Sequence, residues 1–88
     1  MTSSATETAA RAVSVSSTKD ELVVRLHDGR TIIVPLSWYP RLFGATPEQR
    51  EQYRLLGDGE YIHWPAVDED ITVEGLLRGI RAPQKRAG

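Results

Sequence analysis

The chain has 88 residues, no cysteine and a formal net charge of −1 at pH 7. This length suits one small domain, and the lack of cysteine excludes disulfide bonds and thiolate metal sites. The balanced charge argues against a nucleic-acid-binding module, because phosphate binding requires a concentrated basic surface.

The sequence also argues against a membrane protein. No apolar run approaches the roughly 18 residues that a membrane span requires, and the first residues, MTSSATETAARA, lack the apolar core of a signal peptide. We therefore expect a soluble cytoplasmic protein of bacterial type. A small core without disulfide bonds often gains stability from another chain, so we also expect a protein partner or a homodimer.

The chain divides into three parts by composition. Residues 1–11 are rich in Ser, Thr and Ala and predict a disordered tail. Residues 12–81 mix strand and helix patterns, which predicts a single α+β domain of antiparallel hairpins with two or three short helices. Within it, Val13 and Val15 alternate with serines and predict a short first strand. Residues 82–88 predict a flexible basic tail.

Residues 22–34 predict a β-hairpin. Alternating apolar residues flank Asp28-Gly29, a dipeptide typical of a two-residue type I′ turn. A two-residue loop pairs Leu26 with Thr31, and it pairs Val24 with Ile33 on the core face. The opposite face then carries three aliphatic side chains: Val23, Ile32 and Val34. We expect a helix or another chain to cover part of that face.

Two short helices are predicted next. Ser37 is placed to cap a helix over residues 37–43, which Gly44 ends. Thr46, Pro47 and Gln49 have the spacing of a capping box with proline at the first helical position. This pattern predicts a second, largely polar helix.

The last third of the domain predicts a second hairpin and a third helix. Residues 55–56 and 61–64 flank the turn 57–59, which contains two glycines. After Trp64-Pro65, a loop of acidic residues leads to Thr72, a plausible helix cap with Ile71 and Leu76 at the positions of a hydrophobic staple. The apolar stripe predicted for this helix comprises Val73, Leu76, Leu77 and Ile80.

Negative charge is concentrated in residues 57–77, called here the acidic segment. It holds six of the twelve carboxylates and no Lys or Arg. We expect Arg41 and Arg54 to pair with it, within the chain or across a dimer. Exposed pairs of that kind stabilise a protein by at most ~1 kcal/mol.

Two motifs carry a resemblance to a known family. They are residues 36–42, LSWYPRL, and residues 62–65, IHWP, which are followed by the sequence DEDI at 68–71. Over residues 22–79 the chain resembles the bacterial family catalogued as domain of unknown function 2442. The resemblance implies a small α+β domain without an established enzymatic activity. It also implies genetic pairing with a toxin-like neighbour (domain of unknown function 4160), and in some relatives an appended helix-turn-helix.

The candidate site residues have alternative interpretations. His63 and His27 lack an accompanying nucleophile motif, so we expect no catalytic residue. The acidic run Asp68-Glu69-Asp70 could bind a hard cation, but its surroundings lack the EF-hand spacing. We expect solvated carboxylates that cap the following helix, with no metal and no cofactor. The tryptophans are core residues in one interpretation and interface anchors in the other, with Trp64 favoured for the core.

Three function classes remain open. The preferred one is a non-enzymatic protein-interaction module, an antitoxin-like partner whose acidic segment masks a basic site on a small toxin-like protein. The second is a divalent-metal-binding protein or small enzyme that uses the acidic run 68–70. The third is a component of a transcriptional regulator that binds DNA through its basic tail. The predicted partner-binding residues are Trp38, Tyr39, Arg41, His63, Trp64, Asp68, Glu69 and Asp70.

Overall fold

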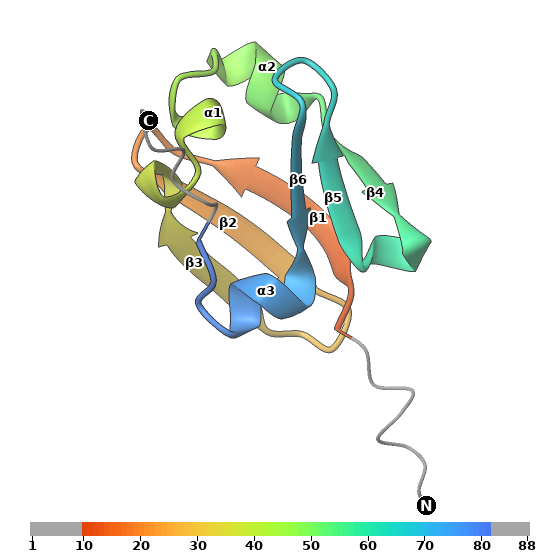
Figure 1. The fold of residues 1–88 in the computed structure, drawn as a ribbon. Coiled ribbons are helices and arrows are strands. Elements are labelled where there is room, and N and C mark those ends of the chain that lie inside the picture. The colour runs from red at the N-terminus through yellow and green to blue at the C-terminus, as the bar shows by residue number, and fades with distance from the viewer. Residues whose placement is uncertain (1–9, 82–88) are drawn as a thin grey trace, which may run out of the picture.

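The computed structural model describes residues 10–81, which form two three-stranded antiparallel sheets and short helices (Figure 1). The predicted α+β class is confirmed. The strands of the first sheet are β1 (Ala12–Ser17), β2 (Glu21–Leu26) and β3 (Thr31–Pro35). Those of the second sheet are β4 (Arg54–Leu56), β5 (Tyr61–Trp64) and β6 (Glu69–Thr72). The predicted tails lie outside the described residues, except for residues 10 and 11.

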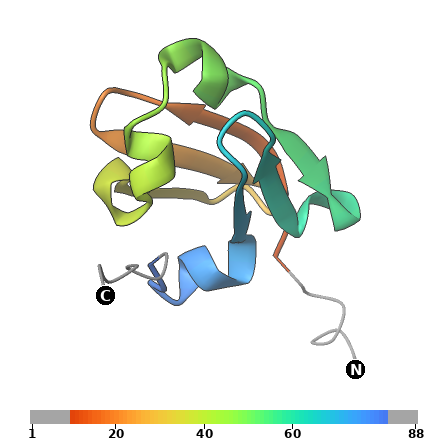
Figure 2. The ribbon, with the colours of Figure 1, turned by 45° about the horizontal axis from the view of Figure 1, so that its top comes forward.

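Helical turns connect and cover these sheets. They are η2 (Leu36–Trp38), α1 (Pro40–Phe43), α2 (Pro47–Glu51), η3 (Gly57–Gly59) and α3 (Val73–Leu77). Two views place α2 and α3 at opposite ends of β6 (Figures 1 and 2). None of the helices in residues 10–81 is long and apolar enough to cross a membrane.

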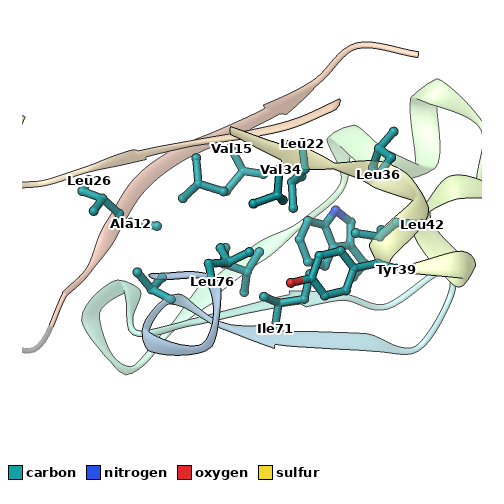
Figure 3. Packing of buried hydrophobic residues seen from close by; sticks show 14 residues of the cluster. Ala12, Val15, Leu22, Leu26, Val34, Leu36, Tyr39, Leu42, Ile71 and Leu76 are labelled. Carbon is teal, nitrogen blue, oxygen red and sulfur yellow. The ribbon is translucent and has the colours of Figure 1, made fainter. Parts of the chain in front are cut away.

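The core lies between the two sheets. Figure 3 shows Val15, Leu22 and Val34 of the first sheet facing Tyr39, Ile71 and Leu76. Trp64 is fully buried there, and its indole N–H donates to the Arg50 carbonyl at 3.1 Å. The indole therefore fills the core without leaving its one donor unsatisfied.

The loop of the first hairpin has three residues, and the predicted two-residue loop was wrong. The Leu26 amide donates to the Arg30 carbonyl at 2.8 Å, and Gly29 has a φ of 98°. The Asp28 carboxylate accepts a hydrogen bond from the Arg30 amide, which holds the turn. Asp-Gly is compatible with either loop, because both place a glycine at a position of positive φ.

The longer loop shifts every pair in this hairpin by one residue. Val24 pairs with Ile32, and Val23 pairs with Ile33. Because side chains alternate between faces, the shift moves Ile33 out of its predicted core position to the outer face, where it is 55% exposed. Val34 moves into the core instead. Because Ile33 is more than half exposed, the predicted cover of this outer face of the first sheet is incomplete within residues 10–81.

The predicted helix over residues 37–43 is interrupted at Tyr39. Pro40 disfavours a helical conformation for the residue before it, and Tyr39 has φ −127° and ψ 86°. The chain therefore forms η2, bends, and begins α1 at Pro40. Ser37 lies inside η2 and caps neither element.

The capping box of the second helix is confirmed. The Gln49 amide donates to the Thr46 hydroxyl at 3.1 Å, and the Thr46 amide donates to the Gln49 side chain at 2.9 Å. The Arg50 guanidinium donates to the carbonyls of Leu42 and Ala45, at the end of α1. One arginine thus joins the two short helices.

The acidic loop predicted before the third helix is partly a strand. Residues 69–72 form β6 and pair with β5 in antiparallel register. Acidic residues have low strand propensity, but the pairing with β5 and the burial of Ile71 override it. A turn precedes the strand, and Asp68 has a φ of 55° in it.

The third helix is capped as predicted but buries less of its predicted stripe. The Thr72 hydroxyl accepts a hydrogen bond from the Gly75 amide at 2.9 Å. The helix ends at Leu77, and Gly79 follows with a φ of 74°. Leu77, the last residue of the helix, and Ile80, which follows the turn, are both exposed.

Gly59 is required by a close approach between η3 and β1. Its φ is 100°, and a side chain there would overlap the carbonyl oxygen of Ala12 and lie 3.0 Å from the Ala12 amide nitrogen. Gly29 has a similar φ of 98° but open space around it. A comparison of substitutions at the two glycines therefore distinguishes the cost of backbone strain from the cost of steric overlap.

We predict that Gly59→Ala destabilises the domain much more than Gly29→Ala. The Gly29 variant should lower the free energy of unfolding by about 1–2 kcal/mol through strain alone. The Gly59 variant should cost at least ~1 kcal/mol more, because β1 must also move. Urea unfolding measures both, and equal losses would contradict the packing described.

Candidate functional site on the second sheet

The second sheet has one face in the core and one in solvent. Strand alternation places Ile62, Trp64 and Ile71 inside. The other face, called here the outer face of the second sheet, has two cross-strand rows: Arg54, His63 and Asp70 in one, and Leu56, Tyr61 and Thr72 in the other. This surface brings together an arginine, an aromatic ring, an imidazole and a carboxylate from three strands.

Leu56 and Tyr61 form the apolar part of this face. They are directly opposite each other on β4 and β5 and are 47% and 48% exposed. The Tyr61 ring lies against the backbone of Gly57, where an added Cβ would be 3.0 Å from the ring. Rigid exposed aromatic residues of this kind are enriched among interface hot spots.

His63 and Asp70 form the polar part of the face. The His63 Nδ1 atom is 2.6 Å from the Asp70 Oδ1 atom, and Asp70 is open to solvent. Thr72 on the same face uses its hydroxyl to accept the Gly75 N–H, so it serves the helix cap. The arrangement offers hydrogen bonds and charge to a partner, and it gives no activated nucleophile.

Alternation in β6 separates the three members of the acidic run. Asp70 points outward, Glu69 points inward, and Asp68 lies in the preceding turn. Arg41 donates to the Asp68 carbonyl at 2.6 Å and lies 4.0 Å from its carboxylate. Both side chains are largely exposed, so this pair stabilises the fold by at most ~1 kcal/mol.

The different directions of Asp68, Glu69 and Asp70 argue against a shared metal site. Within residues 10–81, no group of three or more His, Asp or Glu side chains is placed to hold a metal ion.

The DNA-binding hypothesis rests on the basic tail, most of which lies outside the described residues. Of the two arginines that the structure describes there, Arg78 lies 3.8 Å from Glu74, and Arg81 lies over the Trp38 ring at 4.9 Å.

Burial distinguishes Glu69 from the other carboxylates of the acidic segment. Its side chain points into the interior and is 8% exposed. Burial raises the pKa of Glu69 above its ordinary value, because the charged form loses hydration, while the positive charge of Arg41 opposes the rise. The negative charges of the neighbouring carboxylates Asp70 and Asp68 raise the pKa of Glu69 further. The pKa of Tyr39 is also raised, first by burial and then by the charge of Glu69.

The predicted partner-binding residues do not form one surface. Tyr39, Trp64 and Glu69 are buried. The others divide between His63 and Asp70 on the outer face of the second sheet, Arg41 and Asp68 near the turn before β6, and half-buried Trp38.

Sequence reasoning did not single out Tyr61 and Leu56 as exposed residues of this face. The period of two along the predicted strand 61–64 was sufficient to identify Tyr61 as an exposed residue. Once Trp64 is assigned to the core, Tyr61 and His63 must share the opposite face. The prediction instead chose Trp38 and Tyr39, the aromatic residues of the motif at residues 36–42.

Comparison with known proteins gives the family. A model of the family described as "Protein of unknown function (DUF2442)" matches residues 12–82. The chain belongs to this family. No curated protein matches the chain.

Two solved structures of similar proteins support the fold of this DUF2442 member. The first is the crystal structure of a protein of unknown function from Rhodospirillum rubrum, 28% identical, with a TM-score of 0.73 over 85% of this chain and 93% of that one. The second is the solution NMR structure of an uncharacterized protein from Chromobacterium violaceum, 27% identical, with a TM-score of 0.69 over 83% and 69% of the two chains. Neither similarity brings an activity with it.

We predict that Glu69 makes the domain less stable as the pH rises. Because its pKa is raised in the folded state, the folded protein holds this proton more tightly than the unfolded chain. The resulting stability is present below the ordinary value of 4.5 and is lost as the pH rises through the raised pKa. Glu69→Gln should remove this loss, so the variant should gain stability relative to the parent between about pH 4 and 7.

Urea unfolding at several pH values measures this difference. The matched control is Glu51→Gln, a change at an exposed carboxylate on α2. Its difference from the parent should vary less with pH than that of the Glu69 variant. A Glu69→Gln difference that is constant across this range would contradict the assigned burial.

Proposed function

We propose that this DUF2442 protein is a non-enzymatic interaction module that binds a basic protein through the outer face of its second sheet. The observation that carries the proposal is the exposed Leu56–Tyr61 pair, set beside Asp70 and His63 on a rigid sheet. An apolar centre with a polar border is the usual composition of a protein interface.

The charge around this face favours a basic partner. Asp58 and Asp70 are exposed members of the acidic segment, which contains no Lys or Arg. Arg54 is the basic residue on the face itself. Opposite charge on a partner would accelerate association and orient the complex.

We further propose that the partner is a small toxin-like protein, so that the role is antitoxin-like. The support is the resemblance in sequence, which implies pairing with a protein of the domain of unknown function 4160 type. An antitoxin of this kind acts by occupying a surface of the toxin and needs no chemistry of its own. The exposed Tyr61 and the surrounding carboxylates provide the contacts that such masking requires.

The central test is binding of the full chain to the toxin-like product of a neighbouring gene. We predict that Tyr61→Ala weakens this binding at least ~10-fold, because a hot-spot aromatic commonly contributes more than ~1.4 kcal/mol. Calorimetry measures the dissociation constant. The matched control is Phe43→Ala on α1, which removes an aromatic ring that is 52% exposed elsewhere on the surface and should leave binding unchanged.

A second pair of variants tests the charge. Asp70→Lys should slow association, whereas Asp20→Lys in the exposed turn after β1 should not. Association of the parent should also slow as salt is raised from about 0.05 to 0.5 M, because screening weakens steering between exposed charges. Absence of binding, or binding that none of these changes affects, would refute the proposed function.

A further inference from the structure

A small cavity opens beside β6, at the edge of the second sheet. Its volume is about 190 Å³, and Glu69, Tyr39, Thr72 and Ile80 are among its lining residues. Its lining residues come mainly from β6 and from the chain that follows α3. Asp70 and Thr72 belong both to this cavity and to the outer face of the second sheet.

The Glu69 carboxylate is the unusual group in this cavity. The residue is more than nine-tenths buried, and within residues 10–81 its side chain forms no hydrogen bond or ion pair. In the same part of the chain, the one fully enclosed side-chain polar atom without a partner is Nε of Arg11. The Glu69 oxygens are therefore not sealed in the core, and they have access to the cavity that the residue lines.

Nearby cationic side chains are engaged elsewhere. Arg41 donates to the Asp68 carbonyl at 2.6 Å. Arg81 lines the cavity, but its guanidinium lies over the Trp38 ring at 4.9 Å. A buried carboxylate without a partner is costly, and a cation bound beside it would offset that cost.

The lining of the cavity fits a planar organic cation. A guanidinium group can donate two parallel hydrogen bonds to a carboxylate and can stack on an aromatic ring. Tyr39 supplies a ring, and Figure 3 shows it beside Ile71 of β6. Ile80 offers an apolar surface for an aliphatic stem. Glu69 and Asp70 both line the cavity, but within residues 10–81 no group of three or more His, Asp or Glu side chains is placed to supply the several oxygen ligands that a hard metal ion takes.

We propose that this cavity binds an alkylguanidinium group, supplied by an arginine side chain of the protein partner. This inference rests on the proposed function, since it adds an anchor to the same surface. A partner that covers Asp70 and Thr72 on the outer face lies at the mouth of the cavity. Its arginine reaches over the edge of β6 and pairs with Glu69.

The first experiment uses ethylguanidinium as the probe for the side chain. Titration into the isotopically labelled full chain should give saturable NMR shifts at the backbone amides of Glu69, Thr72 and Gly75. Ethylurea, a neutral molecule of similar shape, should give no such shifts, and sodium chloride at equal concentration controls for ionic strength. Butylammonium tests the geometry, and it should bind more weakly because it lacks the planar fork.

Variants then assign the response to Glu69. Glu69→Gln should abolish the shifts, whereas Glu74→Gln, a change at an exposed carboxylate on α3, should preserve them. Shifts that persist in the Glu69 variant, or that ethylurea reproduces, would overturn the proposal. The comparison of ethylguanidinium with ethylurea on the parent chain decides the matter if Glu69→Gln fails to fold.

The partner complex provides the second experiment. Glu69→Gln should weaken binding of the toxin-like protein at least ~10-fold, and ethylguanidinium should compete with that protein. Normal binding by Glu69→Gln would overturn the arginine anchor and leave the proposed function intact. Failure of the toxin-like protein to bind the parent chain would refute the proposed function and the partner's arginine together, and the probe titration would then report on the cavity alone.

Discussion

Backbone pairing between β5 and β6 determines where the side chains of the acidic run Asp68-Glu69-Asp70 lie. The pairing aligns His63 with Asp70 and forces successive side chains to opposite faces. Two adjacent carboxylates therefore have different environments, with Glu69 in the interior and Asp70 in solvent. Without this strand, the acidic run would be a solvated loop of equivalent charges. With it, the second sheet has a polar outer face and a buried carboxylate at its edge.

The core constrains which aromatic residues remain for a partner. Trp64 and Tyr39 are both buried in the core cluster, and Figure 3 shows Tyr39 packed beside Ile71. A domain this small buries only a modest share of its surface, so it commits its largest residues to stability. Tyr61 is left on the outer face by strand alternation. Tyr61 is therefore the large aromatic side chain that this sheet leaves exposed.

The proposed partner contact and the proposed cation binding require different features of β6. Contact with Tyr61 and Asp70 needs a flat, rigid face, which the three paired strands supply. Insertion of a cation beside Glu69 needs an opening at the sheet edge, where β6 has no further strand beside it in the described residues. An edge strand that is short and carries charged residues also resists pairing with other sheets. These features are compatible because the outer face and the opening meet at the edge of β6, where they share Asp70 and Thr72.

The sequence by itself determined the features that depend on neighbouring residues. The capping box at Thr46, the cap at Thr72 and the position of the second hairpin all follow from interactions within a few residues, and the structure has each of them. The α+β class followed in the same way. Local chemistry is sufficient there, because the groups that satisfy each other are close along the chain.

Only the tertiary structure decided the register of the first hairpin, the existence of β6 and the burial of Glu69. Asp28-Gly29 fits loops of two or three residues, and packing of Val34 against the second sheet accompanies the longer one. The sequence of the acidic run has low strand propensity, and the partner strand β5 supplies the hydrogen bonds that make it a strand. Which carboxylate faces inward then depends on that pairing, a contact between segments that no local pattern encodes.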